Sequence, residues 1–147
     1  MLIGIDSRTT PELLSALARM GHGDEIVIAD RNYPATFSAS GCTIPDVIQY
    51  PGHTATEVAD LITKLMPLDN FHSHSVLRME IDSEPDTMSD VHAEVWALLT
   101  PRLPEGGILS SIERQDFYKH ARQCFAVVQC SEDRPYGCFI LRKGVIF

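Results

Sequence analysis

Apolar residues recur along the chain in alternating helical and extended patterns. Segment 9–20 begins with Thr10-Pro11-Glu12, a helix-start signal, and carries apolar residues at helical spacing. The run 25–30 is apolar and β-branched and ends in Asp30, which is typical of a buried strand. Residues 31 to about 43 are rich in turn formers, so we expect a loop there.

The same alternation continues through the rest of the sequence. Strands are predicted at 46–50, 75–81, 108–112, 124–129 and 138–143. Helices are predicted from 54 to about 66, over the segment with Val91, Val95, Trp96 and Leu99, and through 117–121. Thr54 and Glu57 have capping-box spacing, and Pro101 and Pro104 end the second of these helices. The fold class is therefore α/β: one layered sheet covered by helices in a single domain, 1–147, whose strand order periodicity does not give.

Composition and net charge limit the classes of molecule that the protein is expected to bind. A chain of 147 residues with 44% hydrophobic content is suited to one globular domain with a real core. Its formal net charge of -8 repels the phosphates of nucleic acid and the anionic surface of membranes. We therefore expect no nucleic acid and no membrane partner, and a neutral small-molecule substrate.

The cysteines and the N-terminal segment indicate the compartment. Cys42, Cys124, Cys130 and Cys138 lack CxxC spacing. The apolar run at residues 1–6 is too short for a signal peptide or a membrane span. We expect free thiols and a cytoplasmic protein.

Two residues beside the first predicted strand could carry chemistry. His22 lies between Gly21 and Gly23, which leave its imidazole accessible, and histidine titrates near neutrality as a general acid or base must. The alternative is a histidine that satisfies the free carbonyls at a helix end. Asp30 lies where ligands gather in open α/β sheets, although a turn-forming role has equal weight.

A third group lies near the C-terminus. Arg114, Tyr118 and Tyr136, followed by Gly137 and Cys138, offer donors of fixed geometry and flat apolar faces, which together suit a sugar. Taken singly, each is explained as well by a surface arginine or a half-buried tyrosine. Only their joint occurrence indicates a site.

The sequence gives little support for a metal site, for covalent catalysis or for a nucleotide cofactor. His72 and His74, with His53, could hold a metal, but no carboxylate or cysteine completes a recognised spacing, so we expect none. No GxSxG, GxGxxG or GxxxxGK[ST] motif occurs, so covalent catalysis and nucleotide cofactors are not predicted.

Several of these segments together resemble the family that contains bacterial fucose mutarotase and ribose pyranase. The matching stretches are Pro11-Glu12-Leu13-Leu14, Met20-Gly21-His22-Gly23-Asp24-Glu25-Ile26 with Asp30 and Pro34, Arg114 with Phe117-Tyr118, Phe125-Ala126-Val127-Val128, Tyr136-Gly137, and Ile140 to Val145. The resemblance spans nearly the whole chain. The Arg-x-x-Phe-Tyr stretch is more similar to the fucose branch than to the ribose branch.

The resemblance also implies roles for individual residues. His22 corresponds to the catalytic proton donor, and Asp30, Arg114 and the segment 136–138 correspond to sugar-binding positions. One departure is Cys138, because the family usually has asparagine there. A thiol replaces an amide donor and acceptor, which changes affinity or sugar preference if the family contact is made by the side chain.

The implied activity is that of a cofactor-independent sugar mutarotase. Such an enzyme interconverts the anomers of a monosaccharide such as L-fucose. Its activity can extend to interconversion of the pyranose and furanose forms. The resemblance further implies a homo-oligomer, commonly a decamer, with sites completed across subunit contacts. A non-catalytic monosaccharide-binding or transport-accessory protein is the alternative, and a metal-dependent isomerase using His72 and His74 is a third.

Overall fold

The computed structural model describes all of residues 1–147 and contains one six-stranded sheet. The strands are β1 Glu25–Ala29, β2 Ile48–Tyr50, β3 Val76–Met79, β4 Leu109–Ile112, β5 Ala126–Cys130 and β6 Phe139–Arg142. The helices are α1 Pro11–Arg19, α2 Ala35–Ala39, α3 Ala55–Leu65, α4 Asp90–Leu99 and α5 Arg114–Ala121, with a 3-10 turn at Thr100–Arg102. The predicted α/β class is confirmed.

The strand order is β2-β5-β1-β6-β3-β4, and only β6 runs against the others. β6 is hydrogen-bonded to β1 on one side and to β3 on the other, with Ile140 opposite both Val27 and Leu77. The carboxyl ends of the five parallel strands therefore share one edge of the sheet with the start of β6. In open α/β sheets this is the edge at which ligands bind.

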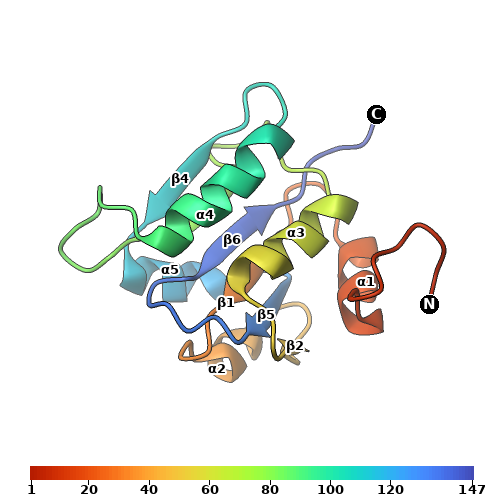
Figure 1. The fold of residues 1–147 in the computed structure, drawn as a ribbon, viewed down its shortest axis with the longest axis horizontal. Coiled ribbons are helices and arrows are strands. Elements are labelled where there is room, and N and C mark those ends of the chain that lie inside the picture. The colour runs from red at the N-terminus through yellow and green to blue at the C-terminus, as the bar shows by residue number, and fades with distance from the viewer.

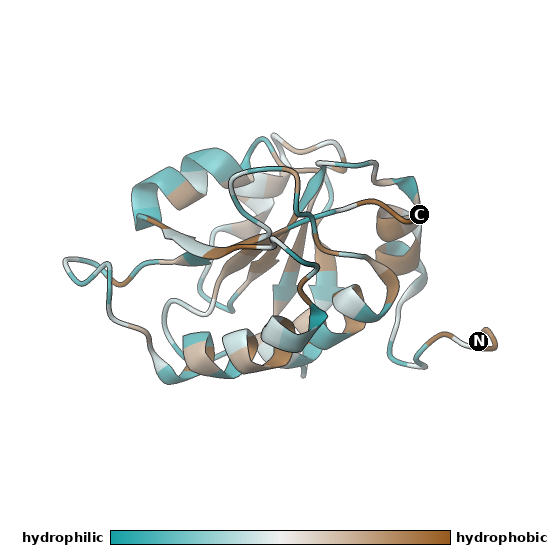
Figure 2. Ribbon diagram, turned by 90° about the horizontal axis from the view of Figure 1, so that it is seen from above, coloured by the Kyte–Doolittle hydropathy of each residue, from teal (hydrophilic) through white to brown (hydrophobic).

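Helices cover both faces of the sheet (Figure 1). α1, α3 and α4 pack over one face in a cluster of 24 buried residues, and α2 and α5 pack over the other in a cluster of 13. Successive residues of β1 alternate between these cores, with Ile26 and Ile28 in the first and Val27 and Ala29 in the second. Figure 2 shows the apolar strands enclosed between the two helical layers.

The local signals of helix starts are confirmed. The Thr10 side chain accepts a hydrogen bond from the Leu13 amide at the start of α1. Thr54 and Glu57 form the predicted capping box of α3, each side chain accepting from the backbone amide of the other. The predicted strands are all present, with shorter bounds. No helix combines the length and apolar character that a membrane span requires.

One detail of the sequence prediction is wrong. The expected loop 31–43 contains α2, a helix of five residues that no side chain caps and that is too short to display a helical period. Its Ala35, Ser38 and Ala39 are nevertheless buried against the sheet. The predicted end of the helix before Pro101 is confirmed: α4 ends at Leu99, and the 3-10 turn that follows ends at Arg102, ahead of Pro104.

A buried carboxylate anchors the amino end of β1. Glu25 is 9% exposed, and its two oxygens contact His74 Nε2 at 2.8 Å, His120 Nε2 at 2.8 Å and Arg142 Nη2 at 3.1 Å. Burial alone would raise the pKa of Glu25, but these hydrogen bonds and the Arg142 charge lower it well below its usual range. One side chain thus ties β1 to β6, to α5 and to the segment before β3.

Replacing this carboxylate should destabilise the protein. We expect Glu25→Gln to lower the free energy of unfolding at pH 7 by about 3 kcal/mol, because three donors lose their charged partner in a buried setting. The native pKa lies below the unfolded one, so the contribution is complete above about pH 4.3 and is lost as the pH falls further. Urea unfolding of both proteins between pH 3 and 7 measures this gap. A gap that does not change with pH would contradict the assigned charge.

Candidate active site

A cavity of about 310 Å³ opens at the carboxyl edge of the sheet. Its walls come from the loops after β1 and β3, from the start of α5 and from the segment before β6. The lining residues are Asp30, Asn32, Tyr33, Met79, Asp82, Arg114, Tyr118, Pro135, Tyr136 and Cys138. A second hollow of about 370 Å³ beside α1 contains none of the predicted site residues.

Asp30 and Cys138 lie together at the base of the cavity. The Asp30 amide donates to Cys138 Sγ at 3.4 Å, and the Asn32 amide donates to Asp30 Oδ1 at 3.0 Å. Burial raises the pKa of Asp30, an effect that the amide hydrogen bonds only partly offset. Burial also raises the pKa of the Cys138 thiol, which therefore stays protonated. The base of the cavity thus carries a carboxylate whose charged form burial disfavours, beside a weakly polar sulfur atom.

Arg114 and two tyrosines form a wall of the cavity. Arg114 Nε donates to both oxygens of Asp82, at 3.0 and 3.1 Å, and its guanidinium carbon lies 5.7 Å from the centre of the Tyr118 ring. The Tyr118 ring packs 5.3 Å from that of Tyr33, whose hydroxyl is held by Ser38 at 2.9 Å. The wall therefore offers aromatic faces together with guanidinium donors of fixed direction.

Tyr136 is held in an unusual backbone conformation. Its φ of 61° lies in the left-handed region, which is uncommon for residues other than glycine. The fully buried His92 donates from Nε2 to the Tyr136 carbonyl at 2.9 Å and accepts from the Ser89 amide at Nδ1. Burial lowers the pKa of His92, which keeps this tautomer neutral. His92 is thus a positioning residue for the loop.

The cavity brings together most of the residues that the sequence indicated. These are Asp30, Arg114, Tyr118, Tyr136 and Cys138. Gly137 does not line the cavity: a Cβ there would lie 2.7 Å from the Glu132 side chain, so this glycine allows tight loop packing. Sequence reasoning missed Asp82 and Asn32. Both lie in irregular segments, and only the side-chain polarity of Asn32 directly after the Asp30 strand end could have indicated its place.

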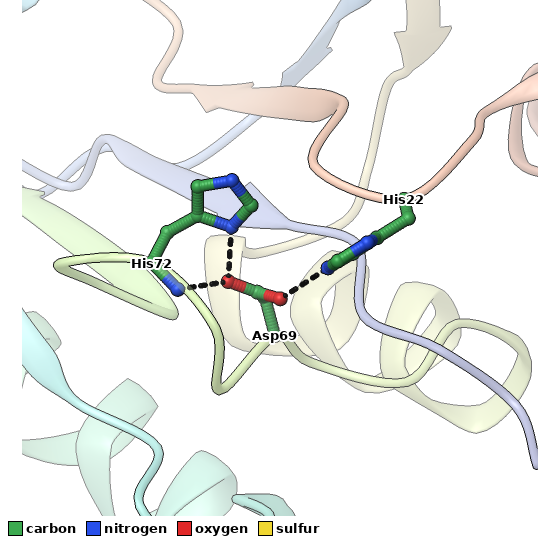
Figure 3. Close-up of side chains that lie close together, drawn as sticks. All are labelled: His22, Asp69 and His72. Carbon is green, nitrogen blue, oxygen red and sulfur yellow. Dashed lines mark hydrogen bonds and ion pairs between the residues drawn. The ribbon is translucent and has the colours of Figure 1, made fainter.

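His22 belongs to a different cluster, shown in Figure 3. Its Nε2 lies 2.8 Å from Asp69 Oδ1, while His72 Nδ1 and the His72 amide lie 2.7 and 2.9 Å from Asp69 Oδ2. The Asp69 side chain has no exposed surface, whereas the imidazoles are 40% and 45% exposed. A carboxylate can only accept, so each imidazole presents its other nitrogen away from Asp69.

The chain after β6 fixes the position of Asp69. The Arg142 carbonyl accepts from the Asp69 amide, and the Lys143 carbonyl accepts from the Gly23 amide. A Cβ at Gly144 would lie 2.5 Å from the Leu68 carbonyl oxygen, so only glycine permits this approach. Burial would raise the pKa of Asp69, but hydrogen bonds from the two histidines lower it to about 2. Sequence reasoning missed Asp69, whose one signal was its spacing three residues before His72.

The two clusters lie at opposite ends of β1. His22 precedes the strand and Asp30 follows it, and five strand residues span roughly 16 Å. Within one chain, His22 therefore does not reach the cavity that holds the other predicted residues.

The histidines considered for a metal site do not converge. His53 Nδ1 contacts the Pro51 carbonyl, and His74 pairs with Glu25. His72 alone of the three joins the cluster of His22 and Asp69. A metal site built from His53, His72 and His74 is therefore wrong as a grouping.

The raised pKa of Asp30 predicts a stabilising substitution. The native carboxyl holds its proton to higher pH than the unfolded one, so stability falls as the pH rises from about 3.9 through the native value. Asn at this position carries no charge and keeps the acceptor oxygen. We expect Asp30→Asn to raise Tm at pH 7, with the gain vanishing below about pH 3.5.

Thermal unfolding of both proteins across this pH range tests the expectation. Asp133→Asn, at an exposed position, serves as the control for loss of a surface charge. A lower Tm for Asp30→Asn at pH 7 would show that hydrogen bonds to the charged carboxylate outweigh the cost of its burial.

Comparison with known proteins finds similar sequences and structures along nearly the whole chain. Residues 3–146 match the model of the RbsD / FucU transport protein family. The chain is 40% identical to human fucose mutarotase over 99% of this chain and 94% of that protein. It is 35% identical to an L-fucose mutarotase of Haemophilus influenzae, covering 99% and 97%. The Streptococcus pneumoniae fucose mutarotase, solved in complex with L-fucose, superimposes with a TM-score of 0.86 at 33% identity, covering 99% and 100%. The chain therefore belongs to the RbsD / FucU transport protein family.

Proposed function

We propose that this protein is an L-fucose mutarotase that interconverts the anomers of its sugar without a cofactor. The main support for the proposal is the cavity at the carboxyl edge of the sheet. It combines Asp30, Arg114 and aromatic faces in a volume of about 310 Å³. Such groups bind hydroxyls and pack on the C–H faces of a neutral sugar. Relatives named fucose mutarotase at 34–40% identity, and a neighbour solved with L-fucose, support the choice of substrate.

The proposed chemistry needs two proton transfers. One group removes the proton of the anomeric hydroxyl while another protonates the ring oxygen, and the C1–O5 bond breaks to give the open aldehyde. Rotation about C1–C2 and the reverse transfers close the other anomer. His22 serves as the acid or base, and Asp69 fixes its ring by the 2.8 Å contact. Asp30 orients hydroxyls, and Arg114 with Tyr136 closes the pocket.

We further propose that the site is shared between two copies of the chain in a homo-oligomer, for which a decamer is our expectation. His22 and the cavity lie at opposite ends of β1, so a second copy must supply His22 to the sugar. Apolar side chains lie exposed at the His22 end of the molecule. These are Phe71, whose ring packs 5.0 Å from His22, and Ile146 and Phe147 beyond β6. Such exposure is expected of a surface that another copy covers.

Two broader expectations belong to the same proposal. The chain acts as one domain, since a single sheet joins elements from Glu25 to Arg142. All four cysteines are free, with Cys124, Cys130 and Cys138 buried, which suits a reducing cytoplasm.

A non-catalytic sugar-binding protein is the competing function. Cys138 favours it, because a buried thiol stands where the resembling family usually has an amide. This alternative predicts sugar affinity without acceleration of anomer exchange.

Removing His22 tests the catalytic role. Saturation-transfer NMR on the anomeric protons of L-fucose, with D-ribose and D-galactose beside it, measures the exchange rate at catalytic protein concentration. We expect His22→Ala to lower the rate for L-fucose by roughly 10²–10⁴-fold, the usual loss for a general acid or base. The fold should persist, because the His22 side chain is 40% exposed.

His53→Ala removes a partly exposed imidazole elsewhere and is the matched control. Full activity of His22→Ala would exclude His22 from the mechanism. Binding of L-fucose by the wild type without any acceleration would favour the sugar-binding alternative.

Mixing two inactive variants tests the shared site. His22→Ala and Arg114→Ala each remove one half of the proposed site. If the halves come from different chains, random co-assembly after unfolding and refolding together should restore about a quarter of the sites. The NMR exchange rate of the mixture measures this recovery. No recovery, in a mixture shown by mass spectrometry to contain both chains, would place His22 and Arg114 in one chain's site or in none.

A further inference from the structure

Three metal-ligating side chains converge outside the cavity. His22 lies on the loop before β1, and Asp69 and His72 lie on the segment between α3 and β3. One ligand atom from each lies within 4.8 Å of the other two. Both imidazoles face the same carboxylate, which is fully buried and held by backbone hydrogen bonds (Figure 3). The anchor of the cluster is therefore rigid, and within one chain its open side is uncovered.

This donor set has a definite preference among metals. Two imidazole nitrogens and one carboxylate oxygen suit Zn²⁺, Ni²⁺ and Cu²⁺, whereas Ca²⁺ and Mg²⁺ prefer oxygen ligands alone. A metal between the three groups would bind the nitrogen lone pairs that face Asp69, after each neutral imidazole moves its proton to its outer nitrogen. Because the imidazoles are 40% and 45% exposed, water has room to complete the coordination.

Charge also favours a cation here. The ion pairs of Asp69 are made with His22 and His72 and with no lysine or arginine. A second group with metal-ligand chemistry, Glu25 with His120 and Cys124, differs in this respect. Its carboxylate already pairs with Arg142, and burial raises the pKa of its thiol. The net charge of -8 adds a general attraction for cations.

We propose that His22, Asp69 and His72 form a binding site for one divalent transition-metal ion of the Zn²⁺ class. With the metal on His22 Nε2, the outer nitrogen of the ring carries the proton and cannot accept another, so the bound metal withdraws His22 from proton transfer. The metal is thus an inhibitor of the exchange reaction. Metal binding is independent of the proposed mutarotase function, whereas inhibition rests on it.

Isothermal titration calorimetry with Zn²⁺, on the full chain, tests the site. His72→Gln removes one ligand at a half-exposed position, and His53→Gln removes a partly exposed histidine elsewhere. We expect the first variant to weaken Zn²⁺ binding by roughly 100-fold, since even loss of an outer partner of a metal ligand costs about 10–100-fold. The second variant should bind as the wild type does. Equal affinity in all three proteins, or equal loss in both variants, would overturn the proposal.

Two further measurements identify the ligands without relying on a variant. In the wild type, Zn²⁺ should shift the imidazole NMR signals of His22 and His72 and leave that of His53 unchanged. Co²⁺ in place of Zn²⁺ should give visible absorption that His72→Gln lacks. Shifts at His74 and His120 instead would assign the metal to the Glu25 cluster and reject this site.

The effect on exchange separates the site from the proposed function. Zn²⁺ should suppress wild-type L-fucose exchange and EDTA should restore it, while the activity that His72→Gln retains, whatever its level, should be insensitive to Zn²⁺. Zn²⁺ bound at His22 and His72 with exchange unaffected would refute the inhibition and the role of His22. Zn²⁺ bound there in a protein with no exchange activity would refute only the proposed function.

Discussion

The pairing of β6 between β1 and β3 is the constraint on which both the cavity and the His22 cluster depend. As the single strand that runs against the other five, β6 starts at the edge where they finish. Cys138 lies just before β6, and its Sγ accepts a hydrogen bond from the Asp30 amide at the base of the cavity. At the other end, the carbonyls of Arg142 and Lys143 hold Asp69 and the loop of His22. One strand therefore sets the geometry of two sites that do not touch.

How much of this could be predicted follows from the range of each interaction. Thr10 and the pair Thr54 and Glu57 act over three residues, so the sequence displays the helix starts that they cap. The short α2 lacks such a cap, so the sequence predicts a loop in its place. The place of β6 depends on pairing between distant segments, and neither periodicity nor turn residues encode which strands become neighbours.

The candidate site divides in the same way. Asp30 and the segment 136–138 could be indicated because they flank strands and because the chain resembles a known family. Asp69 and Asp82 could not, since each lies in an irregular segment and gains its partner, His22 or Arg114, only through the folded topology. The resemblance grouped His22 with the cavity residues, yet the length of β1 separates them. The resemblance thus groups residues that a single chain does not bring together.

The histidines of this chain differ in how far solvent reaches them. His92 is enclosed, and burial lowers its pKa, so it keeps one tautomer and holds the Tyr136 carbonyl with a hydrogen bond that neutral solution does not disturb. His22 and His72, in contrast, meet solvent over nearly half of their side chains. The imidazole that holds the cavity loop is thus shielded from the solvent that the other two meet. The shape of the loop therefore persists across neutral pH, because its supporting histidine stays uncharged there.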